Sequence, residues 1–550
     1  MFADLILLGR VLTMDPVQPV AQAVAIIADK ISAVGDRTTV LAMAGPQTVI
    51  TNYQTATILP GFVESHLHLV LGGAQLSHLD LGGVYDSQTA GAAFRGYAAA
   101  NPDAPLLMAN GGTYSFDSQP ITRATLDGFV ADRPIALMSI DLHTVWANTL
   151  ALKMAGLLHG AAMPPGHEVV IGTDDTATGE LREFEAFAPI IALGDEGRLN
   201  LGISTGRDPD PWPNAAEQAI DQAKVKLGLA HCARHGITSM VNMDGNRYTL
   251  DLLAAIRAEG GLTARVKVPF HFKPAMDLTD LDTASAFHAD FNDDRISAGF
   301  VKFFMDGVTD SRTAYQLHDY PGHPGHRSAP LFSAEQFAQI ATEVDKRGLQ
   351  IAVHAIGDGA VRLTIDGIAA ARAANGSRDA RHRIEHIELI DPADIPRLAA
   401  LGITASVQPV HAPGAMDFAL QPTLDIIGAN RWADAYLAKT LADHGAHIAY
   451  ASDWPVTDVN VLRGIKAALT RPTYAGGTDQ SIGLRASLHA CTAGGAWAAH
   501  MDHLTGTLRP GLAADIVVLS GDIEVTPPDQ IDQMHIARTI CAGQTTWLAD

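Results

Sequence analysis

The sequence predicts an α/β protein: a TIM-like (β/α)8 barrel, a small β-sandwich built from both termini, and a long insertion after the first barrel strand. Short apolar segments alternate with helix-like stretches, which is typical of a parallel sheet, and eight such strands favour a closed barrel. The predicted strands are Gly61–His68, Ile237–Met243, Ala264–Phe272, Gly299–Met305, Leu349–His354, Arg383–Leu389, Ile403–Gln408 and His447–Ala451. Helical patterns cover Ala216–Arg234, Ala334–Arg347, Gly359–Ala373 and Asn430–Asp443.

The connection between the first two strands is far longer than a βα unit requires. We therefore expect a barrel domain over residues 59–503 that contains an inserted subdomain over residues 72–230. Strand candidates inside it are Pro105–Ala109 and Pro134–Ile140. Because insertions after barrel strands lie on the face that carries the chemistry, this subdomain is predicted to roof the active site.

The two ends of the chain are rich in short strand patterns separated by turns. At the N-terminal end these are Asp4–Leu8, Ala21–Ile27, Lys30–Gly35 and Thr48–Ile50, and at the C-terminal end Leu504–Leu519 and Ala537–Trp547. Neither end is long enough to bury much of a core alone. We expect residues 1–58 and 504–550 to meet in one composite β-sandwich.

Composition narrows the class of partner and the compartment. The chain has 550 residues, a formal net charge of -22 and 47% hydrophobic residues, which argues against nucleic acid or an anionic membrane as a partner. The three cysteines are too few for a disulfide framework, and the N-terminus has no basic leader. These features predict a cytoplasmic protein; they are compatible with a small-molecule substrate but indicate none. A barrel of this size commonly forms homo-oligomers.

Two histidines interrupt the first predicted strand at alternate positions, His66 and His68. Residues two apart on a strand point to the same face, so the two imidazoles converge. Neutral imidazoles on a rigid strand are good ligands for zinc or a similar ion. A pair of hydrogen-bonded core histidines explains this motif alone equally well.

Further residues of ligand type lie in or just after other predicted strands: Lys302, His354, His386 and Asp453. Each has an ordinary structural explanation by itself, such as a core histidine or a carboxylate at a strand end. Together with His66 and His68 they occupy strands one, four, five, six and eight of one barrel. That distribution indicates a shared site at one end of the barrel.

Longer motifs extend this pattern over nearly the whole chain. They include Leu59–His68, Asp141–Asn148, Thr178–Glu183, Val301–Gly307, Ser311–Ala314, His354–Asp358, Arg383–His386, Ser406–Pro409, Ser452–Val456 and Gly506–Asp515. With these motifs the chain resembles the amidohydrolase superfamily of metal-dependent hydrolases. It most closely resembles the YtcJ-like branch, amidohydrolase family 3, which includes N-substituted formamide deformylases. Val308–Asp310 departs from the usual glycine- and serine-rich turn of the family.

The resemblance implies a metal centre, with two zinc ions per chain as the expected content. His66, His68 and Asp453 would hold one ion, His354 and His386 a second, and Lys302 would bridge them as its N6-carboxylated form. A site with one metal and an unmodified lysine is the competing form. Asp453, Lys302 and His386 are the expected catalytic groups, with Asp453 transferring the proton of the attacking water.

The predicted reaction is hydrolysis of a non-peptide carbon–nitrogen bond in an amide, formamide or cyclic amide by metal-activated hydroxide. Two alternatives stay open. The same centre could hydrolyse an ester, a lactone or a phosphoester, or the chain could be a catalytically silent sensor. A silent protein would be expected to lack one or more of the ligands, and this chain has all six.

Substrate contacts are expected from the insertion and from the loops after strands four and seven: His143, Trp146, Arg312, Gln408, His411, Arg431 and Tyr436. Arg431 and Tyr436 would also fit an exposed helix face, and Trp146 would also fit a packing role in the lid. Glu183, Asp244 and Asp358 are interpreted as members of structural pairs.

Overall fold

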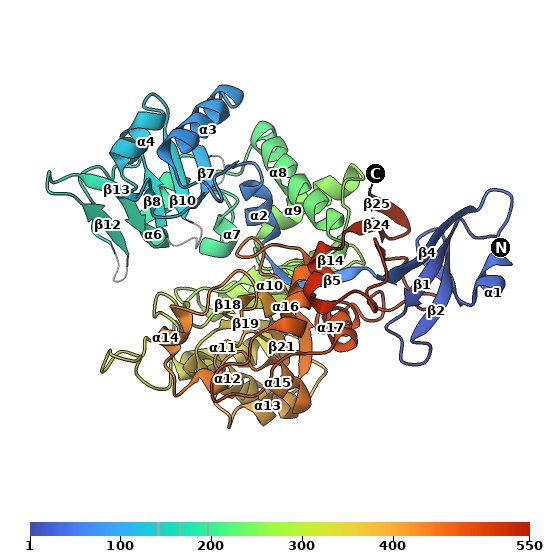
Figure 1. Cartoon of the computed structure of the whole chain (residues 1–550). Helices are drawn as coiled ribbons and strands as arrows, with labels where there is room; N and C mark the ends of the chain where they lie inside the picture. The colour runs from blue at the N-terminus through green and yellow to red at the C-terminus, as the bar shows by residue number, and fades with distance from the viewer. Residues whose placement is uncertain (140–143, 164–166, 195–196, 550) are drawn as a thin grey trace. The chain divides into compact units, whose positions relative to one another are not determined.

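The computed structural model describes residues 1–139, 144–163, 167–194 and 197–549. The chain divides into two compact units (Figure 1). The first unit contains Met1–Leu69 and Leu229–Asp550, and the second contains Val70–Gly228. The second unit corresponds closely in its limits to the insertion expected at residues 72–230.

The first unit contains a strand in each of the eight segments expected of a barrel. Strands adjacent in sequence pair in parallel, in a four-stranded sheet of order β17-β15-β14-β5 and a six-stranded sheet of order β16-β18-β19-β20-β21-β22. The bounds are β5 Phe62–Leu67, β14 Ile237–Asn242, β15 Arg265–Lys267, β16 Phe270–His271, β17 Ile296–Ser297, β18 Phe300–Phe304, β19 Gln350–Ala355, β20 Arg383–His386, β21 Thr404–Val407 and β22 His447–Tyr450.

The third predicted strand, Ala264–Phe272, is divided between the two sheets as β15 and β16, and a short strand, β17, precedes the fourth predicted strand, which contains β18. Between β17 and β18, Gly299 adopts a φ of +115°, and a Cβ there would lie 2.7 Å from His288 Nδ1. Only glycine tolerates both conditions, so the chain bends at this point. After the bend, β18 aligns with β19 and carries Lys302 beside Ala352.

Backbone hydrogen bonds connect the first strand to the segment that follows the last one. The amide of Asp453 donates to His66 O at 2.9 Å, and the amide of His68 donates to Trp454 O at 2.7 Å. These bonds bring residues far apart in sequence to the same end of β5. They fix Asp453 beside both histidines.

Amphipathic helices follow several of these strands. In α11, Ala334–Lys346, the Ser333 side chain caps the first turn, and Phe337, Ile340, Ala341 and Val344 form the buried face. This spacing is the apolar stripe of a helix that packs on a sheet. Helix α8, Ala215–Arg234, begins in the second unit and ends in the first. The other helices of the first unit are α9 Arg247–Ala258, α10 Leu281–Asp290, α12 Asp358–Asn375, α13 Ile395–Leu401, α14 Thr423–Ile427, α15 Ala438–Asp443, α16 Val461–Thr470, α17 Leu484–Ala490 and α18 Ala493–Ala498.

The helix predicted over Asn430–Asp443 is wrong in its first half. A short 3-10 turn covers Trp432–Asp434, and the α-helix α15 begins only at Ala438. Tyr436 between them has a φ of +54°, and its amide donates to Glu388 O at 2.7 Å. The backbone pairs with the segment after β20, and this pairing replaces helical hydrogen bonds.

Strands from both chain ends form one seven-stranded sheet of order β25-β24-β23-β4-β1-β2-β3. Their bounds are β1 Leu5–Leu12, β2 Val20–Ile27, β3 Lys30–Gly35, β4 Val49–Pro60, β23 Ile516–Leu519, β24 Ile536–Cys541 and β25 Gln544–Leu548. One face packs Val40 of the short helix α1, Arg37–Leu41, against Ile6, Leu8 and Ala23. The other buries a larger apolar cluster that includes Leu508 and Ala514. A two-layered sandwich at this end stays a prediction.

The second unit has its own sheet and its own core. Six strands pair in the order β12-β13-β11-β10-β7-β6, with bounds β6 Leu79–Asp80, β7 Leu107–Gly112, β10 Ile135–Ser139, β11 Thr144–Ala147, β12 Glu168–Ile171 and β13 Ala177–Arg182. A small hairpin pairs β8 Ser115–Phe116 with β9 Gln119–Pro120. The helices are α3 Ser87–Ala100, α4 Arg123–Phe129, α5 Thr149–Met154, α6 Phe184–Ile191 and α7 Leu201–Ser204; α2, Leu69–Gln75, leads in from the first unit. That this unit roofs the active site remains a prediction.

Among the described residues, no helix combines the length and the apolar character needed to cross a lipid bilayer.

A buried ion pair joins strand β15 to the terminal sheet. Arg265 on β15 donates from Nε to Asp515 Oδ2 at 2.7 Å and from Nη2 to Asp515 Oδ1 at 3.1 Å. Asp515 precedes β23 and also accepts from the amide of Ala542. Both side chains are almost fully buried, at 3% and 0% exposure.

We expect Asp515→Ala to lower the free energy of unfolding by about 3–5 kcal/mol, because it leaves the buried guanidinium of Arg265 without its counter-charge. Urea unfolding followed by circular dichroism measures the change. Glu168→Ala, which removes the exposed partner of Arg182, is the control and should cost at most about 1 kcal/mol. Equal effects of the two substitutions would contradict a structural role for the Arg265–Asp515 pair.

Candidate metal centre

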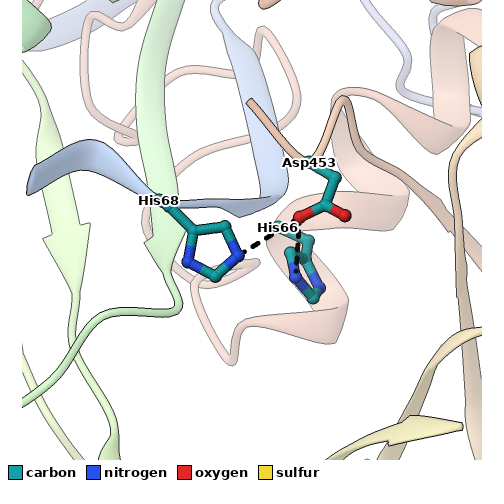
Figure 2. Close-up of side chains that lie close together, drawn as sticks. All are labelled: His66, His68 and Asp453. Carbon is teal, nitrogen blue, oxygen red and sulfur yellow. Dashed lines mark ion pairs between the residues drawn. The ribbon is translucent and has the colours of Figure 1, made fainter. Parts of the chain in front are cut away.

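His66, His68 and Asp453 form a buried cluster at the end of β5. Figure 2 shows the carboxylate of Asp453 facing both rings. Asp453 Oδ1 lies 3.2 Å from His66 Nε2 and 3.3 Å from His68 Nε2. Their side chains are between 1% and 9% exposed. The strand places both histidines on one face, and the backbone bonds described above bring in the aspartate.

The opposite nitrogen of each ring is held by a buried carboxylate. His66 Nδ1 lies 2.8 Å from Glu385 Oε2, and His68 Nδ1 lies 2.6 Å from Asp244 Oδ1. A carboxylate accepts a hydrogen bond, so it fixes the proton of each imidazole on Nδ1. In the neutral rings, Nε2 is then an acceptor pointing at Asp453. A carboxylate behind each histidine is typical of metal ligands.

This arrangement favours a cation between the three side chains. Within the described part of the chain, no hydrogen bond of adequate geometry reaches Asp453 Oδ1 despite the short distances. Burial alone would lower the pKa of His68, but Asp244 and Asp453 raise it to about 9. Burial alone would raise the pKa of Asp453, but His66 and His68 hold it well below its usual range. Two imidazole nitrogens and a carboxylate oxygen fit an ion of the zinc class.

His354 and His386 lie beside this cluster. The ring centres of His66 and His386 are 5.0 Å apart, and those of His354 and His386 are 4.5 Å apart. His354 Nε2 donates to Gly307 O at 3.0 Å, and His386 Nδ1 donates to Gln408 Oε1 at 2.9 Å. Burial lowers the pKa of both rings, that of His354 to about 3. Each is therefore a neutral imidazole with one nitrogen left to bind a metal.

Lys302 is fully buried on β18, and its ammonium nitrogen has no hydrogen-bond partner among the described residues. A second buried lysine, Lys267 on β15, donates to Gln350 Oε1 and to Ala499 O, both at 3.0 Å. Burial lowers the pKa of Lys302 to about 8, with Glu385 and Asp453 opposing the shift. A buried lysine without partners is costly as an ammonium group, so this side chain is suited to a modified or metal-bound form.

His411 and Gln408, both predicted as substrate contacts, border the cluster from the segment after β21. The His411 ring stacks on His386 at 6.1 Å with an angle of 7° between the planes. His386, His411 and Asp453 each offer a ligand atom within 4.8 Å of the others. His411 Nε2 and Gln408 Nε2 have no hydrogen-bond partner within the described ranges. Both groups can therefore bond to a ligand.

Arg431 and Arg312, two other candidates, make contacts within the protein. Arg431 forms an ion pair with Asp358 and donates to Gln316 Oε1 at 3.0 Å. Arg312 lies in a turn with a φ of +58°, and its carbonyl contacts His326 Nε2 at 3.2 Å.

Tyr436 is buried, in contrast to the exposed helix face considered from the sequence. It lines a small cavity with space for about one water molecule, together with His386, Glu388, Gln408, His411 and Arg471.

The two candidates in the insertion belong to the second unit. Trp146 on β11 is 1% exposed and packs in that unit's core, edge-on to Tyr114 with ring centres 5.0 Å apart. This buried position agrees with the alternative that Trp146 has a packing role. His143 lies outside the described residues.

Several buried polar side chains were not identified as candidates from the sequence. Arg383 donates to both oxygens of Glu385, at 2.5 and 3.0 Å, and with His66 holds the pKa of this buried carboxyl well below its usual range. The spacing of Arg383 and Glu385 could have identified this pair, because residues two apart on a strand place their side chains on the same face. His271 on β16, paired with Lys302, is fully buried, and neither ring nitrogen has a hydrogen-bond partner in the described chain. No sequence signal distinguished His271.

Comparison with known proteins agrees with this site. The sequence model described as "Amidohydrolase family" matches residues 54–547. The chain is 28% identical to the protein LONG AFTER FAR-RED 3 of Arabidopsis thaliana, covering 94% of this chain and 87% of that protein. It is 26% identical to the putative amidohydrolase YtcJ of Bacillus subtilis (strain 168), covering 91% of each. It is 23% identical to the N-substituted formamide deformylase of Arthrobacter pascens, covering 98% and 97%.

Solved structures support the same fold. An uncharacterised metal-dependent hydrolase from Pyrococcus horikoshii aligns with a TM-score of 0.75 at 21% identity, over 96% of this chain and 98% of that one. An adenosine deaminase from Xanthomonas campestris with bound zinc aligns with a TM-score of 0.53 at 14% identity, over 99% and 93%. The resemblance read from the motifs is therefore confirmed: the chain belongs to the amidohydrolase family of metal-dependent hydrolases.

Proposed function

We propose that this protein hydrolyses a non-peptide carbon–nitrogen bond in a small amide, formamide or cyclic amide. The observation that carries the proposal is the buried cluster of His66, His68 and Asp453, in which both Nε2 atoms lie within 3.3 Å of one carboxylate oxygen. Family membership gives the reaction class, and the likeness to a formamide deformylase supports the substrate class. A cytoplasmic location remains part of this proposal.

The two parallel sheets are proposed to form one eight-stranded barrel. The split strands β15–β16 and β17–β18 run through both sheets, and backbone bonds from Asp453 and Trp454 reach β5. These links supply the continuity that a closed sheet requires. In a barrel, the candidate ligands would share the carboxyl ends of the strands, where active sites of this fold lie.

The metal content is proposed to be two divalent ions, with zinc preferred by the donor set. His66, His68 and Asp453 would hold one, His354 and His386 the other. Lys302 would bridge them after its neutral amine adds to carbon dioxide and releases a proton, which gives a carbamate with two oxygens. When bound, the ions would lower the pKa of water from 15.7 to about 7 and polarise the substrate carbonyl.

The side chains of this protein then have separable tasks. Glu385 and Asp244 hold the two histidines of β5 in one tautomer and orientation. Asp453 would accept the proton of the attacking water and pass it to the leaving nitrogen, since an amine leaves poorly unless protonated.

Gln408, His411 and Tyr436 border the cavity beside His386 and are the proposed substrate contacts. Contacts from Arg312, Arg431, Trp146 and His143 stay predictions with weaker support.

Asp453→Asn is expected to lower kcat by at least about 10²-fold, because an amide cannot carry the proton from water to the leaving group. Steady-state kinetics on metal-replete protein, with metal content measured in the same sample, checks this. Asp443→Asn, at an exposed position on α15, should leave kcat unchanged. A near-normal kcat in metal-replete Asp453→Asn protein would refute the assignment.

Lys302→Ala is expected to reduce bound metal from two equivalents to one or fewer, because it removes the bridging group. Elemental analysis of the purified protein gives the count. The matched control is Lys267→Met, since Lys267 is an equally buried lysine whose hydrogen bonds are made to the protein. If Lys302→Ala protein still holds two metals at full occupancy, the lysine does not bridge.

The substrate class is tested with a panel of N-substituted formamides, amides and cyclic amides beside matched esters, lactones and phosphoesters. We expect amine release to exceed alcohol release on matched pairs, and chelation to abolish it. Faster alcohol release would favour the ester, lactone or phosphoester alternative. If the metal-replete protein hydrolyses no compound on the panel, the result would favour a catalytically silent sensor.

A further inference from the structure

A second group of metal-ligand side chains lies outside the centre described above. His231 and His235 near the end of α8, and Asp458 in the segment after β22, each offer one ligand atom, and these atoms all lie within 4.8 Å of one another. None of the three belongs to the cluster around Asp453. All three are in the first unit of the chain.

His231 lies in the last turn of α8, and His235 is the first residue after the helix, about one turn further on. Their ring centres are 4.7 Å apart with an angle of 65° between the planes. His235 Nδ1 donates to His231 O at 3.0 Å, which leaves Nε2 as the acceptor of the neutral ring. A backbone carbonyl that fixes the second nitrogen is what metal-binding histidines commonly have.

Residues of the segment after β22 lie against these two histidines. Trp454 stacks on the His231 ring with centres 5.2 Å apart and an angle of 29°, so the half-buried ring is held against the segment after β22. Asp458 is exposed, and its Oδ1 accepts from the amide of Asn460 at 3.0 Å. Arg463 Nε lies 4.0 Å from Asp458 Oδ2, and Arg234 is a second cation near His231, so a bound metal would have to displace or tolerate both.

We propose that His231, His235 and Asp458 bind a divalent transition-metal ion of the zinc class, as a site separate from the centre at Asp453. Two imidazoles and one carboxylate suit zinc, copper or nickel better than calcium or magnesium, which prefer oxygen ligands. Three protein ligands leave a position for water. The bound ion would link the C-terminal end of α8 to the segment that carries Asp453 and Trp454.

The test counts Zn²⁺ per chain in the full-length protein after equilibration at a fixed free Zn²⁺ concentration. A pH near 7.5 is suitable, because an ordinary histidine with a pKa of about 6.5 is then mostly neutral. We expect the wild-type protein to hold one more equivalent than either His235→Gln or Asp458→Asn. We also expect each substitution to weaken this extra binding at least about 10-fold, as loss of metal-site partners does.

Two matched controls separate ligand loss from loss of a surface contact. His444→Gln removes an exposed histidine whose Nδ1 also contacts the carbonyl four residues earlier, at 2.8 Å. Asp479→Asn removes an exposed aspartate that also accepts from the amide two residues later, at 2.8 Å. Both controls should keep the wild-type count. Equal Zn²⁺ content in wild type, His235→Gln and Asp458→Asn would overturn the proposal, as would an equal loss in the two controls.

Discussion

The contact between Asp453 and the two histidines of β5 is the constraint on which the site depends. A carboxylate oxygen within 3.3 Å of two imidazole nitrogens, all buried, is costly unless a positive charge lies among them. The backbone bonds between β5 and the segment after β22 keep the groups in this arrangement. The fold therefore prepares a cation site before any cation binds.

The buried charges around this contact are organised in the same way. Arg383 pairs with Glu385, and Glu385 holds His66, so a guanidinium on β20 orients a ligand on β5. Asp244, after β14, does the same for His68. Removing one member would leave the others buried and unpaired, which costs more than the lost bond itself. In contrast, Lys302 and His271 have buried nitrogens without hydrogen-bond partners in the described chain.

Much of the fold was predictable, because most of the eight expected strands are short, largely apolar runs and α11 has a clear apolar stripe. The helix expected from residue 430 failed because periodicity does not report tertiary backbone pairing, and the amide of Tyr436 bonds to Glu388. Of the expected ligands, His66, His68, Asp453 and His386 lie together with measured short contacts. Trp146 instead lies in the core of its own unit, since an aromatic residue on a strand satisfies either role.

By itself, the sequence determined which residue types alternate on each strand, and so which side chains share a face. That His66 and His68 share one face could be determined in this way, since side-chain direction on a strand follows from local geometry. Only the tertiary structure decided that Glu385 and Asp244 hold these histidines and that Asp453 meets them. It also decided that His231 and His235 meet Asp458. Those partners are far apart along the chain, and only folding brings them within bonding distance.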